Sequence, residues 1–441
     1  MKYSGQSIAV LGCATSGIAA ARLARHHGAQ VTLLDSSDSE AVQLRAKPLR
    51  DQGFSVLLGN AALTTRRKFD LVILSPGIDP TWPLARRYLE RGIRCIGELE
   101  FAWQNCTKPV IAITGTNGKT TTTELIERLL LAAGIKTIAG ANYGVAFSEL
   151  ILEGAPVDVY TLEVSSFQLE LIETFHPKIA VWLNFAPDHL DRHPSLEAYR
   201  KAKLRIFENQ TPDDIAIING AESYPEIAAQ KVTFSAYMID TEYHLRVGKI
   251  WHQNERLFDM AKTNLRGLHN AENVMAAVAA ARAMGIGYEA MEKTLATYRP
   301  PKHRCEFVAT VGGREFINDS KATNLHAMES ALRGFENPVI LIAGGKQKGL
   351  DYAPLTPLVK EKTRCVFTIG EIKDLLARTW GDAVPTQSCE SLEDAVKRSF
   401  QAAEPGETIL FSPGTSSFDM FQGYDHRGQV FCDIVHQLEE L

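Results

Sequence analysis

The chain has 441 residues, of which 45% are hydrophobic and 22% charged, and its formal net charge is −5 at pH 7. This length predicts two or three domains of roughly 150 residues each. The absence of a strongly basic segment argues against nucleic acid as a partner, and no apolar run approaches the roughly 18 residues of a membrane span. The seven cysteines form no Cys-x-x-Cys pair, so we expect reduced thiols and a cytoplasmic protein.

The first hundred residues alternate short apolar runs with helical patterns, which predicts a doubly wound parallel sheet. The clearest runs are Ile8–Leu11, Gln30–Leu34 and Asp70–Leu74. Gly12 to Gly17 follow the first run and Asp35 ends the second, as in a dinucleotide fingerprint. Ala14, however, replaces the glycine that lets a pyrophosphate approach. The segment therefore indicates either a site for another nucleotide diphosphate or a packing turn without a ligand.

The second segment begins with a phosphate-loop pattern. The apolar run Val110–Ile113 precedes Gly-Thr-Asn-Gly-Lys-Thr-Thr at 115–121, and an amphipathic helix is expected over Leu125–Ala133. Glycines and a helix N-terminus suit an anion, Lys119 can reach outer phosphates, and Thr120 can ligate Mg²⁺. Ile113 stands where the strict motif has its first glycine, so an ordinary strand-to-helix turn is the alternative.

Further polar residues of this segment follow predicted strands, namely Val157–Glu163, Ile179–Asn184 and Ile215–Asn219. Glu163 could bind Mg²⁺ beside Thr120, because Mg²⁺ prefers oxygen ligands. The charged run from Asp188 to His193 follows the second of these strands, and Lys203 lies on the next helix. Each residue alone is more often structural, and only their joint placement at carboxyl ends of strands favours a site.

Beyond these strands, Val232–Phe258 alternates and predicts an antiparallel excursion, and Asn273–Ala283 predicts a helix. Arg299-Pro300-Pro301-Lys302 then interrupts the pattern and is expected to be a hinge. Together these signals predict three α/β modules, over residues 1–107, 108–299 and 300–441. The first and third are expected to be Rossmann-like, and the central one resembles a P-loop ATPase domain.

In the third module three predicted strands each lead into a polar loop that contains glycine or serine. The loops are Asn318–Asn324 after Arg314–Ile317, Gly344–Gly349 after Val339–Ala343, and Ser412–Asp419 after Thr408–Phe411. Each alone is explained by turn chemistry. Three at one sheet edge predict a pocket for an anionic substrate.

These motifs together resemble the Mur ligases, ATP-dependent amino-acid ligases of peptidoglycan synthesis. The resemblance covers essentially the whole chain and rests on 115–121, Asp188–Arg192, His269–Asn273, His303-Arg304 and Asn318–Thr323. It implies an ATP-dependent ligase that proceeds through an acyl phosphate. The compact length, the turn at 75–78 and the stretch from Ser412 to Asp419 favour the branch that adds D-glutamate to UDP-N-acetylmuramoyl-L-alanine.

The resemblance also implies roles for individual residues. ATP would be bound by Gly115, Thr116, Asn117, Gly118, Lys119, Thr120, Thr121, Asn270, Asn273, Arg304, Asp319 and Lys321. The catalytic group would be Lys119, Glu163, His189 and Lys203, with two Mg²⁺ ions held by Thr120, Glu163, His189 and a carbamylated Lys203. The UDP substrate would meet Thr15, Ser16, Asp35 and Asn142. D-Glutamate would meet Thr323, Lys348, Ser417 and Phe418. The resemblance implies that these small molecules are the only partners. It also implies a monomer that does not insert into a membrane.

Three other functions stay open at this point. A superfamily ligase could use a different amino acid or a folate acceptor. An NAD-dependent oxidoreductase could be built on the first module, although Ala14 and the phosphate loop elsewhere argue against it. A nucleotide-gated binding protein without chemistry is disfavoured by the grouping of Glu163, His189 and Lys203.

Overall fold

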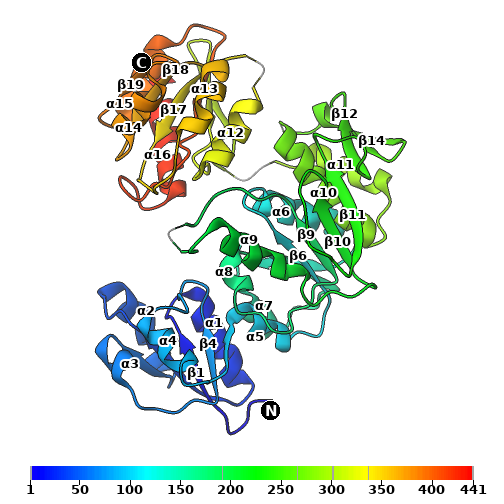
Figure 1. The fold of residues 1–441 in the computed structure, drawn as a ribbon, viewed down its shortest axis with the longest axis vertical. Coiled ribbons are helices and arrows are strands. Elements are labelled where there is room, and N and C mark those ends of the chain that lie inside the picture. Colours follow the sequence, from blue (N-terminus) through cyan, green and yellow to red (C-terminus); the bar gives the residue numbers. More distant parts are fainter. Residues whose placement is uncertain (1, 191, 266, 300–301, 336, 440–441) are drawn as a thin grey trace.

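Three α/β units follow one another along the long axis of the molecule, and the chain starts and ends at opposite ends of that axis (Figure 1). The computed structural model describes residues 2–190, 192–265, 267–299, 302–335 and 337–439. Each unit has its own sheet, so the α/β class with three sheets expected from the sequence is confirmed. The expected hinge includes Pro300 and Pro301, which lie outside the described residues.

The first unit contains a parallel sheet with the strand order β3-β2-β1-β4-β5. Every residue of β4 is buried, as expected where helices cover both faces of a parallel sheet. The strands are β1 (Ser7–Leu11), β2 (Gln30–Asp35), β3 (Ser55–Leu58), β4 (Leu71–Leu74) and β5 (Cys95–Gly97). The helices are α1 (Thr15–His26), α2 (Glu40–Asp51), α3 (Asn60–Thr64), α4 (Pro83–Leu89) and α5 (Glu98–Gln104).

The second unit has the strand order β14-β13-β12-β11-β10-β9-β6-β8-β7 among the residues described. Its strands are β6 (Val110–Thr114), β7 (Thr137–Ala141), β8 (Val159–Glu163), β9 (Ile179–Trp182), β10 (Ile215–Asn219), β11 (Gln230–Ser235), β12 (Tyr243–Arg246), β13 (Lys249–His252) and β14 (Glu255–Asp259). Its helices are α6 (Lys119–Ala132), α7 (Phe147–Glu153), α8 (Ser166–Leu169), α9 (Leu196–Leu204), α10 (Leu268–Ala283) and α11 (Tyr288–Thr297), with short 3₁₀ turns at Arg205–Phe207 and Met260–Lys262.

The expectation that Val232–Phe258 is an antiparallel excursion is only partly right. Strands β12 to β14 pair antiparallel through two tight turns. Strand β11, in contrast, continues the parallel part of the sheet beside β10, and β12 is parallel to β11. Alternation of apolar and polar residues shows that one face is exposed, but it carries no information on strand direction, which explains the error.

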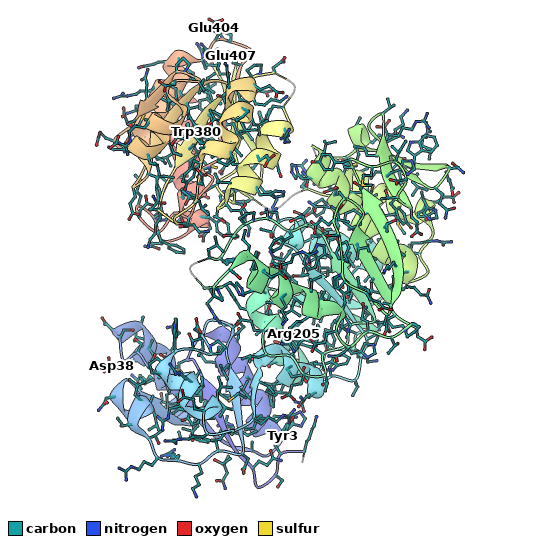
Figure 2. The ribbon with its side chains drawn as sticks, viewed as in Figure 1. Tyr3, Asp38, Arg205, Trp380, Glu404 and Glu407 are labelled. Atoms are coloured by element: carbon teal, nitrogen blue, oxygen red, sulfur yellow. The ribbon has the colours of Figure 1, made fainter. Side chains whose placement is uncertain are left out.

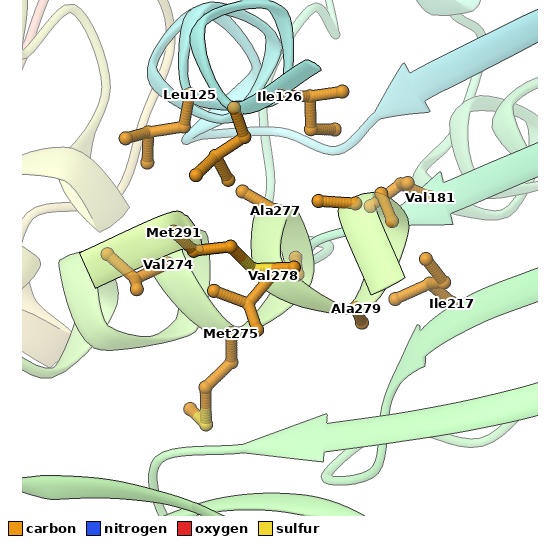
Figure 3. Close-up of a cluster of buried hydrophobic side chains, with 14 of the residues drawn as sticks. Leu125, Ile126, Val181, Ile217, Val274, Met275, Ala277, Val278, Ala279 and Met291 are labelled. Atoms are coloured by element: carbon orange, nitrogen blue, oxygen red, sulfur yellow. The ribbon is translucent and has the colours of Figure 1, made fainter. Parts of the chain in front are cut away.

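Helix α10 forms the centre of the second unit. It lies between α6 and strands β9 and β10, and most of its residues are buried on all sides (Figure 3). From Val274 to Ala281 the helix is apolar all round, as is typical of a core helix, and its alanines, such as Ala277, let the neighbouring elements approach. Burial of Val274 and Val278 contributes about 1.5–3 kcal/mol each. This packing fixes α6, the helix that follows the phosphate loop.

The third unit has the strand order β15-β16-β20-β17-β18-β19, with β15 antiparallel to β16 and the other pairs parallel. Trp380 is fully buried in it, whereas Glu404 and Glu407 lie at the end away from the second unit (Figure 2). The strands are β15 (Glu306–Val311), β16 (Arg314–Asn318), β17 (Val339–Gly344), β18 (Thr363–Ile369), β19 (Thr386–Ser388) and β20 (Thr408–Phe411). The helices are α12 (Leu325–Arg333), α13 (Thr356–Lys362), α14 (Lys373–Trp380), α15 (Leu392–Ala402) and α16 (Tyr424–Glu439), with a 3₁₀ turn at Ala353–Leu355.

The first and second units are joined by ion pairs as well as by packing of α1 on α7. Arg192 of the second unit contacts Asp79 of the first at 2.9 Å and Glu170 of its own unit at 2.9 Å. Arg192 is only 15% exposed, so this bridge is screened less than a surface pair. It connects the charged run after β9 to the turn after β4.

Candidate active site

The phosphate loop has the backbone that an anion site requires. It runs from β6 to α6, and α6 begins at Lys119 without a side-chain cap. Gly118 has φ +85°, and a Cβ there would lie 2.2 Å from Asn273 Oδ1. Only glycine fits a left-handed position with so close a neighbour. The uncapped N–H groups at the start of α6 are therefore available to a phosphate.

Two lysines reach the phosphate loop from different helices. Lys119 Nζ donates to the carbonyls of Gly115 at 2.8 Å and Thr116 at 2.9 Å, and Lys203 Nζ from α9 donates to the Gly115 carbonyl at 2.8 Å. Burial lowers the pKa of both ammonium groups, and for Lys203 the charge of Lys119 adds to the effect. Lys203 is only 2% exposed, so its pKa lies far below the ordinary value. Burial therefore disfavours the charged form of both amines when no anion is bound.

An oxygen-rich group lies beside the start of α6. Glu163 is buried at the end of β8, where its Oε2 accepts from Thr120 Oγ1 at 2.9 Å and its Oε1 from Asn142 Nδ2 at 2.7 Å. A carboxylate and a hydroxyl next to a phosphate loop form the oxygen ligand set that Mg²⁺ prefers. Thr120 and Glu163 are therefore suitable ligands for the Mg²⁺ ion that the sequence predicted. Asn142 lies here, in the second unit, and not with the other residues expected to bind UDP.

Helix α10 supplies polar residues on the other side of the loop. Asn273 Nδ2 donates to Asn270 Oδ1 at 3.2 Å, and Asn273 Oδ1 accepts from Thr122 Oγ1 at 3.4 Å. Burial raises the pKa of the adjacent Glu272 carboxyl to about 7. This side of the cavity therefore offers amide groups and a carboxyl that ionises less readily than usual, which suit the polar edge of a base better than a phosphate.

The third unit contributes its own charged groups. Asp319 is buried, its Oδ2 accepts from Ser412 Oγ at 2.7 Å, and burial raises the pKa of its carboxyl to about 6. Lys321 Nζ donates to the hydroxyl of Tyr424 at 2.8 Å. Arg304 Nε is buried without a hydrogen-bond partner in the described structure. An unpaired buried guanidinium nitrogen is costly, and an anionic ligand would satisfy it.

Asp188 joins the second unit to the third. Its Oδ1 pairs with Lys348 Nζ at 2.7 Å, and its Oδ2 accepts from Asn324 Nδ2 at 3.0 Å. Burial raises the pKa of the Asp188 carboxyl, but the charges of His189 and Lys348 outweigh burial, so the pKa lies below its ordinary value. A second contact links Asn117 Nδ2 to His326 Nδ1 at 2.8 Å.

These groups surround one cavity of about 500 Å³ between the second and third units. That volume is typical of a small-molecule site. The cavity is lined by thirteen of the residues singled out in the sequence: Thr116, Asn117, Gly118, Lys119, Thr120, Asn142, Glu163, His189, Asn273, Arg304, Asp319, Lys321 and Thr323.

Other expected site residues lie outside this lining. Gly115, Thr121, Lys203 and Asn270 stand behind it, and Lys348 is held by Asp188 at its edge. In the loop after β20, Ser417 is buried, whereas Phe418 is 66% exposed.

The first unit holds the remaining expected residues. Thr15 and Ser16 start α1, and both oxygens of Asp35 accept backbone N–H groups, from Cys13 and Ser37, at 2.9 Å each. Through its hydrogen bond to Cys13, Asp35 shapes the loop after β1. A Cβ on Gly17 would lie 2.0 Å from the Gly12 carbonyl, so packing requires glycine at position 17.

Sequence reasoning missed several cavity residues. His326, Tyr424 and Tyr237 line the cavity but belong to no motif. Tyr199 is also buried beneath the loop, 3.3 Å from Thr116 Oγ1 and with Lys203 Nζ 4.9 Å from its ring centre. Only Asn324 had a usable signal, because it ends a polar loop already noted. Lone aromatic and histidine residues carry no local pattern.

Within the described ranges, every helix is too short or too polar to cross a bilayer.

The sequence matches known domain families over both the second and the third unit. The Mur ligase middle domain matches residues 113–281, and the Mur ligase, glutamate ligase domain matches residues 303–414. A protein from Trichlorobacter lovleyi named UDP-N-acetylmuramoylalanine--D-glutamate ligase is 40% identical, over 99% of this chain and 100% of that protein. The protein of the same name from Aquifex aeolicus is 39% identical, over 88% of this chain and 94% of its own length.

Solved structures agree on the fold. The UDP-N-acetylmuramate-alanine ligase MurC from Thermotoga maritima has a TM-score of 0.61 and 18% identity, with 98% of this chain and 99% of that chain covered. MurF ligase from the same organism, solved with ADP, has a TM-score of 0.61 and 14% identity, with 99% and 96% covered. Since identity near 40% extends along nearly the whole sequence and both domain matches agree with it, this chain belongs to the Mur ligase family.

Proposed function

We propose that the protein uses ATP to join D-glutamate to UDP-N-acetylmuramoyl-L-alanine, in the synthesis of peptidoglycan precursors in the cytoplasm. The observation that carries the proposal is the single cavity in which the phosphate loop and Lys119 face Arg304 and Lys321 of another unit. Relatives near 40% identity that are named for this ligation give the substrate class. Residues 1–107 would hold the UDP end, 108–299 the ATP, and 300–441 the amino acid.

The reaction follows in two steps. An oxygen of the alanyl carboxylate attacks the γ-phosphorus of ATP, the bond to the bridging oxygen breaks, and ADP leaves. The product is an acyl phosphate. The D-glutamate nitrogen then attacks its carbonyl carbon and loses a proton, and the tetrahedral intermediate expels inorganic phosphate as the amide forms. No protein nucleophile is needed in either step.

The protein contributes mainly position and charge, which is what phosphoryl transfer requires. Lys119 would hold the outer phosphates, and Arg304 would use the nitrogen that now lacks a partner. Such preorganised cations are worth several kcal/mol in a transition state. Thr120 and Glu163 offer oxygen ligands for Mg²⁺, which would supply further positive charge beside the phosphates.

Lys203 is proposed to carry a carbamate. Its lowered pKa leaves part of the amine uncharged, and an uncharged amine nitrogen can attack CO₂ and release a proton. The carboxylate formed would provide, with His189, ligands for a second Mg²⁺. We expect Lys203→Ala to be nearly inactive and to recover partly with acetate or formate, whereas Lys201→Ala, on an exposed position of the same helix, keeps full activity. A variant that is active without any added carboxylate would rule the carbamate out.

The deciding experiment is ATP-dependent phosphate release with a panel of substrates. We expect turnover only with UDP-N-acetylmuramoyl-L-alanine and D-glutamate together. L-Glutamate, L-alanine and folates serve as alternative substrates. Turnover with one of these instead would assign the chain another amino acid, and no ATP consumption at all would reject a ligase.

The arrangement of the third unit gives a second test. We propose a monomer in which this unit closes further on ATP, because Arg304 and Lys119 belong to different units and must meet one ligand. X-ray scattering should show a smaller radius of gyration with ATP and the acceptor than without them. Superimposable profiles would contradict closure.

A further inference from the structure

A second cluster of potential ligands lies where the third unit begins. His303 precedes β15, Glu306 is its first residue, and Cys432 projects from α16. One ligand atom from each lies within 4.8 Å of the other two, which no other three His, Cys, Asp or Glu residues achieve in the described ranges. His303 Nδ1 and Glu306 Oε2 are 3.6 Å apart.

The interior of this cluster has more acceptors than donors. Asn318 Nδ2 lies 2.8 Å from His303 Nδ1, 3.1 Å from the Gly428 carbonyl oxygen and 3.2 Å from Cys432 Sγ. Its Oδ1 is turned away and accepts from Ser320 N. An amide nitrogen has two hydrogens, so it cannot serve all three acceptors. His303 Nδ1, the Gly428 carbonyl and Cys432 Sγ therefore converge on the Asn318 amide nitrogen, and a cation in its place would bind all three. Glu306 Oε2 lies beside them and accepts the His303 backbone N–H at 2.8 Å.

The backbone is shaped to allow this approach. A Cβ on Gly428 would lie 2.4 Å from His303 Nδ1, so glycine at this position of α16 lets the imidazole reach the helix. His303 has φ +64°, which is uncommon for a residue other than glycine. The side chain is thus held against Cys432 at some cost to the backbone.

We propose that His303, Glu306 and Cys432 form a binding site for one Zn²⁺ ion. Imidazole nitrogen, thiolate sulfur and carboxylate oxygen are the usual ligands of zinc, and sulfur disfavours Mg²⁺. The Gly428 carbonyl or a water would complete four ligands. Zinc bonds of about 2.0–2.3 Å place ligand atoms roughly 3.5 Å apart, so the widest pair must contract by about 1 Å while the Asn318 amide rotates away.

The site would act on the neighbouring nucleotide cavity. Arg304 and Cys305 lie between His303 and Glu306 in the chain, and Cys305 has φ +44°. An ion that holds His303 and Glu306 against α16 would fix the backbone conformation of Arg304. We therefore expect bound Zn²⁺ to change the KM for ATP, and this consequence rests on the proposed function, whereas the binding itself does not.

Binding is tested first, without ATP, on the chelator-treated full chain titrated with Co²⁺ as a spectroscopic probe. We expect one equivalent to give a thiolate-to-cobalt absorption band that Zn²⁺ removes. Cys432→Ala should lose the band and bind Zn²⁺ at least tenfold more weakly. Glu306→Gln, a milder change, should weaken binding at least threefold. Cys365→Ala is the matched control, since this half-buried cysteine of the same unit belongs to no such cluster.

The site is refuted if wild type shows no thiolate band, or if the band persists in Cys432→Ala. The effect on ATP is then measured at saturating Mg²⁺ with one equivalent of Zn²⁺. We expect at least a threefold change in KM for wild type and none for Cys432→Ala. An equal change in both would place the effect at the Mg²⁺ ligands and overturn the link to Arg304.

Discussion

Replacing Lys119 by alanine removes the amine that donates to the carbonyls of Gly115 and Thr116 in the phosphate loop. A unit charge about 4 Å from a phosphate oxygen, at an effective dielectric constant of about 20, contributes roughly 4 kcal/mol. If that interaction is made fully only in the transition state, kcat falls by about 10³-fold. Arg304 and Lys321 of the third unit remain at the cavity, so we expect a loss between about 10² and 10³.

The fold should tolerate this change. Lys119 loses two hydrogen bonds to loop carbonyls, each worth about 1 kcal/mol, while Lys203 still serves the Gly115 carbonyl. The assay is steady-state ADP release, with binding of the UDP substrate measured separately by calorimetry and expected to be unchanged. Lys136→Ala, at an exposed site shortly after the same helix, is the control. A kcat within tenfold of wild type would refute the assigned role.

Three further changes test other parts of the cavity. Gly118→Ala puts a methyl group 2.2 Å from Asn273 Oδ1, at a residue with φ +85°. The free energy of unfolding should fall by about 1–2 kcal/mol, as measured by thermal unfolding. The KM for ATP should rise, as measured by steady-state kinetics. Asp188→Asn and Lys348→Met should each lower kcat/KM, and a double-mutant cycle on kcat/KM should give a coupling energy of about 1–3 kcal/mol. Additive effects of the two substitutions would show that the ion pair does not contribute to catalysis. The pKa of Glu272 is about 7, above the ordinary 4.5, so the stability linked to its proton is full below pH 4.5 and lost as pH rises to 7. Glu272→Gln should therefore be more stable than wild type at pH 8, by up to roughly 3 kcal/mol, and no more stable at pH 4.5, as melting curves at both pH values will show.

The elements that the sequence predicted best are those encoded locally. A buried strand, a glycine turn and an amphipathic helix are adjacent in the chain, so one short stretch of sequence predicts the phosphate loop and α6. The helix, expected over Leu125–Ala133, spans Lys119–Ala132, and Gly134 with φ +81° lies just beyond its end. Helix α10, predicted to start at Asn273, begins at Leu268. The first turn of α10 carries polar residues that face the cavity. A prediction based on the spacing of apolar residues therefore misses this turn.

What the sequence could not predict depends on contacts between distant residues. Asp188 meets Lys348 across 160 positions, and Asn117 meets His326 across 209. Such pairs require the relative placement of two units, which no local pattern contains. The parallel pairing of β11 was missed for a similar reason, since strand direction is set by the chain connection rather than by alternation.

The contacts between the second and third units have a consequence for ligand binding. Asn117 belongs to the phosphate loop itself, and Asp188 adjoins His189, which lines the same cavity. The groups that dock the third unit are thus the neighbours of those that would hold the phosphates. A ligand that contacts both units binds the docked arrangement more tightly than an undocked one. It favours docking by the difference between these two binding free energies. Thermodynamic linkage then requires the reverse as well: a third unit held in place by its own substrate must raise the affinity of the phosphate loop for ATP.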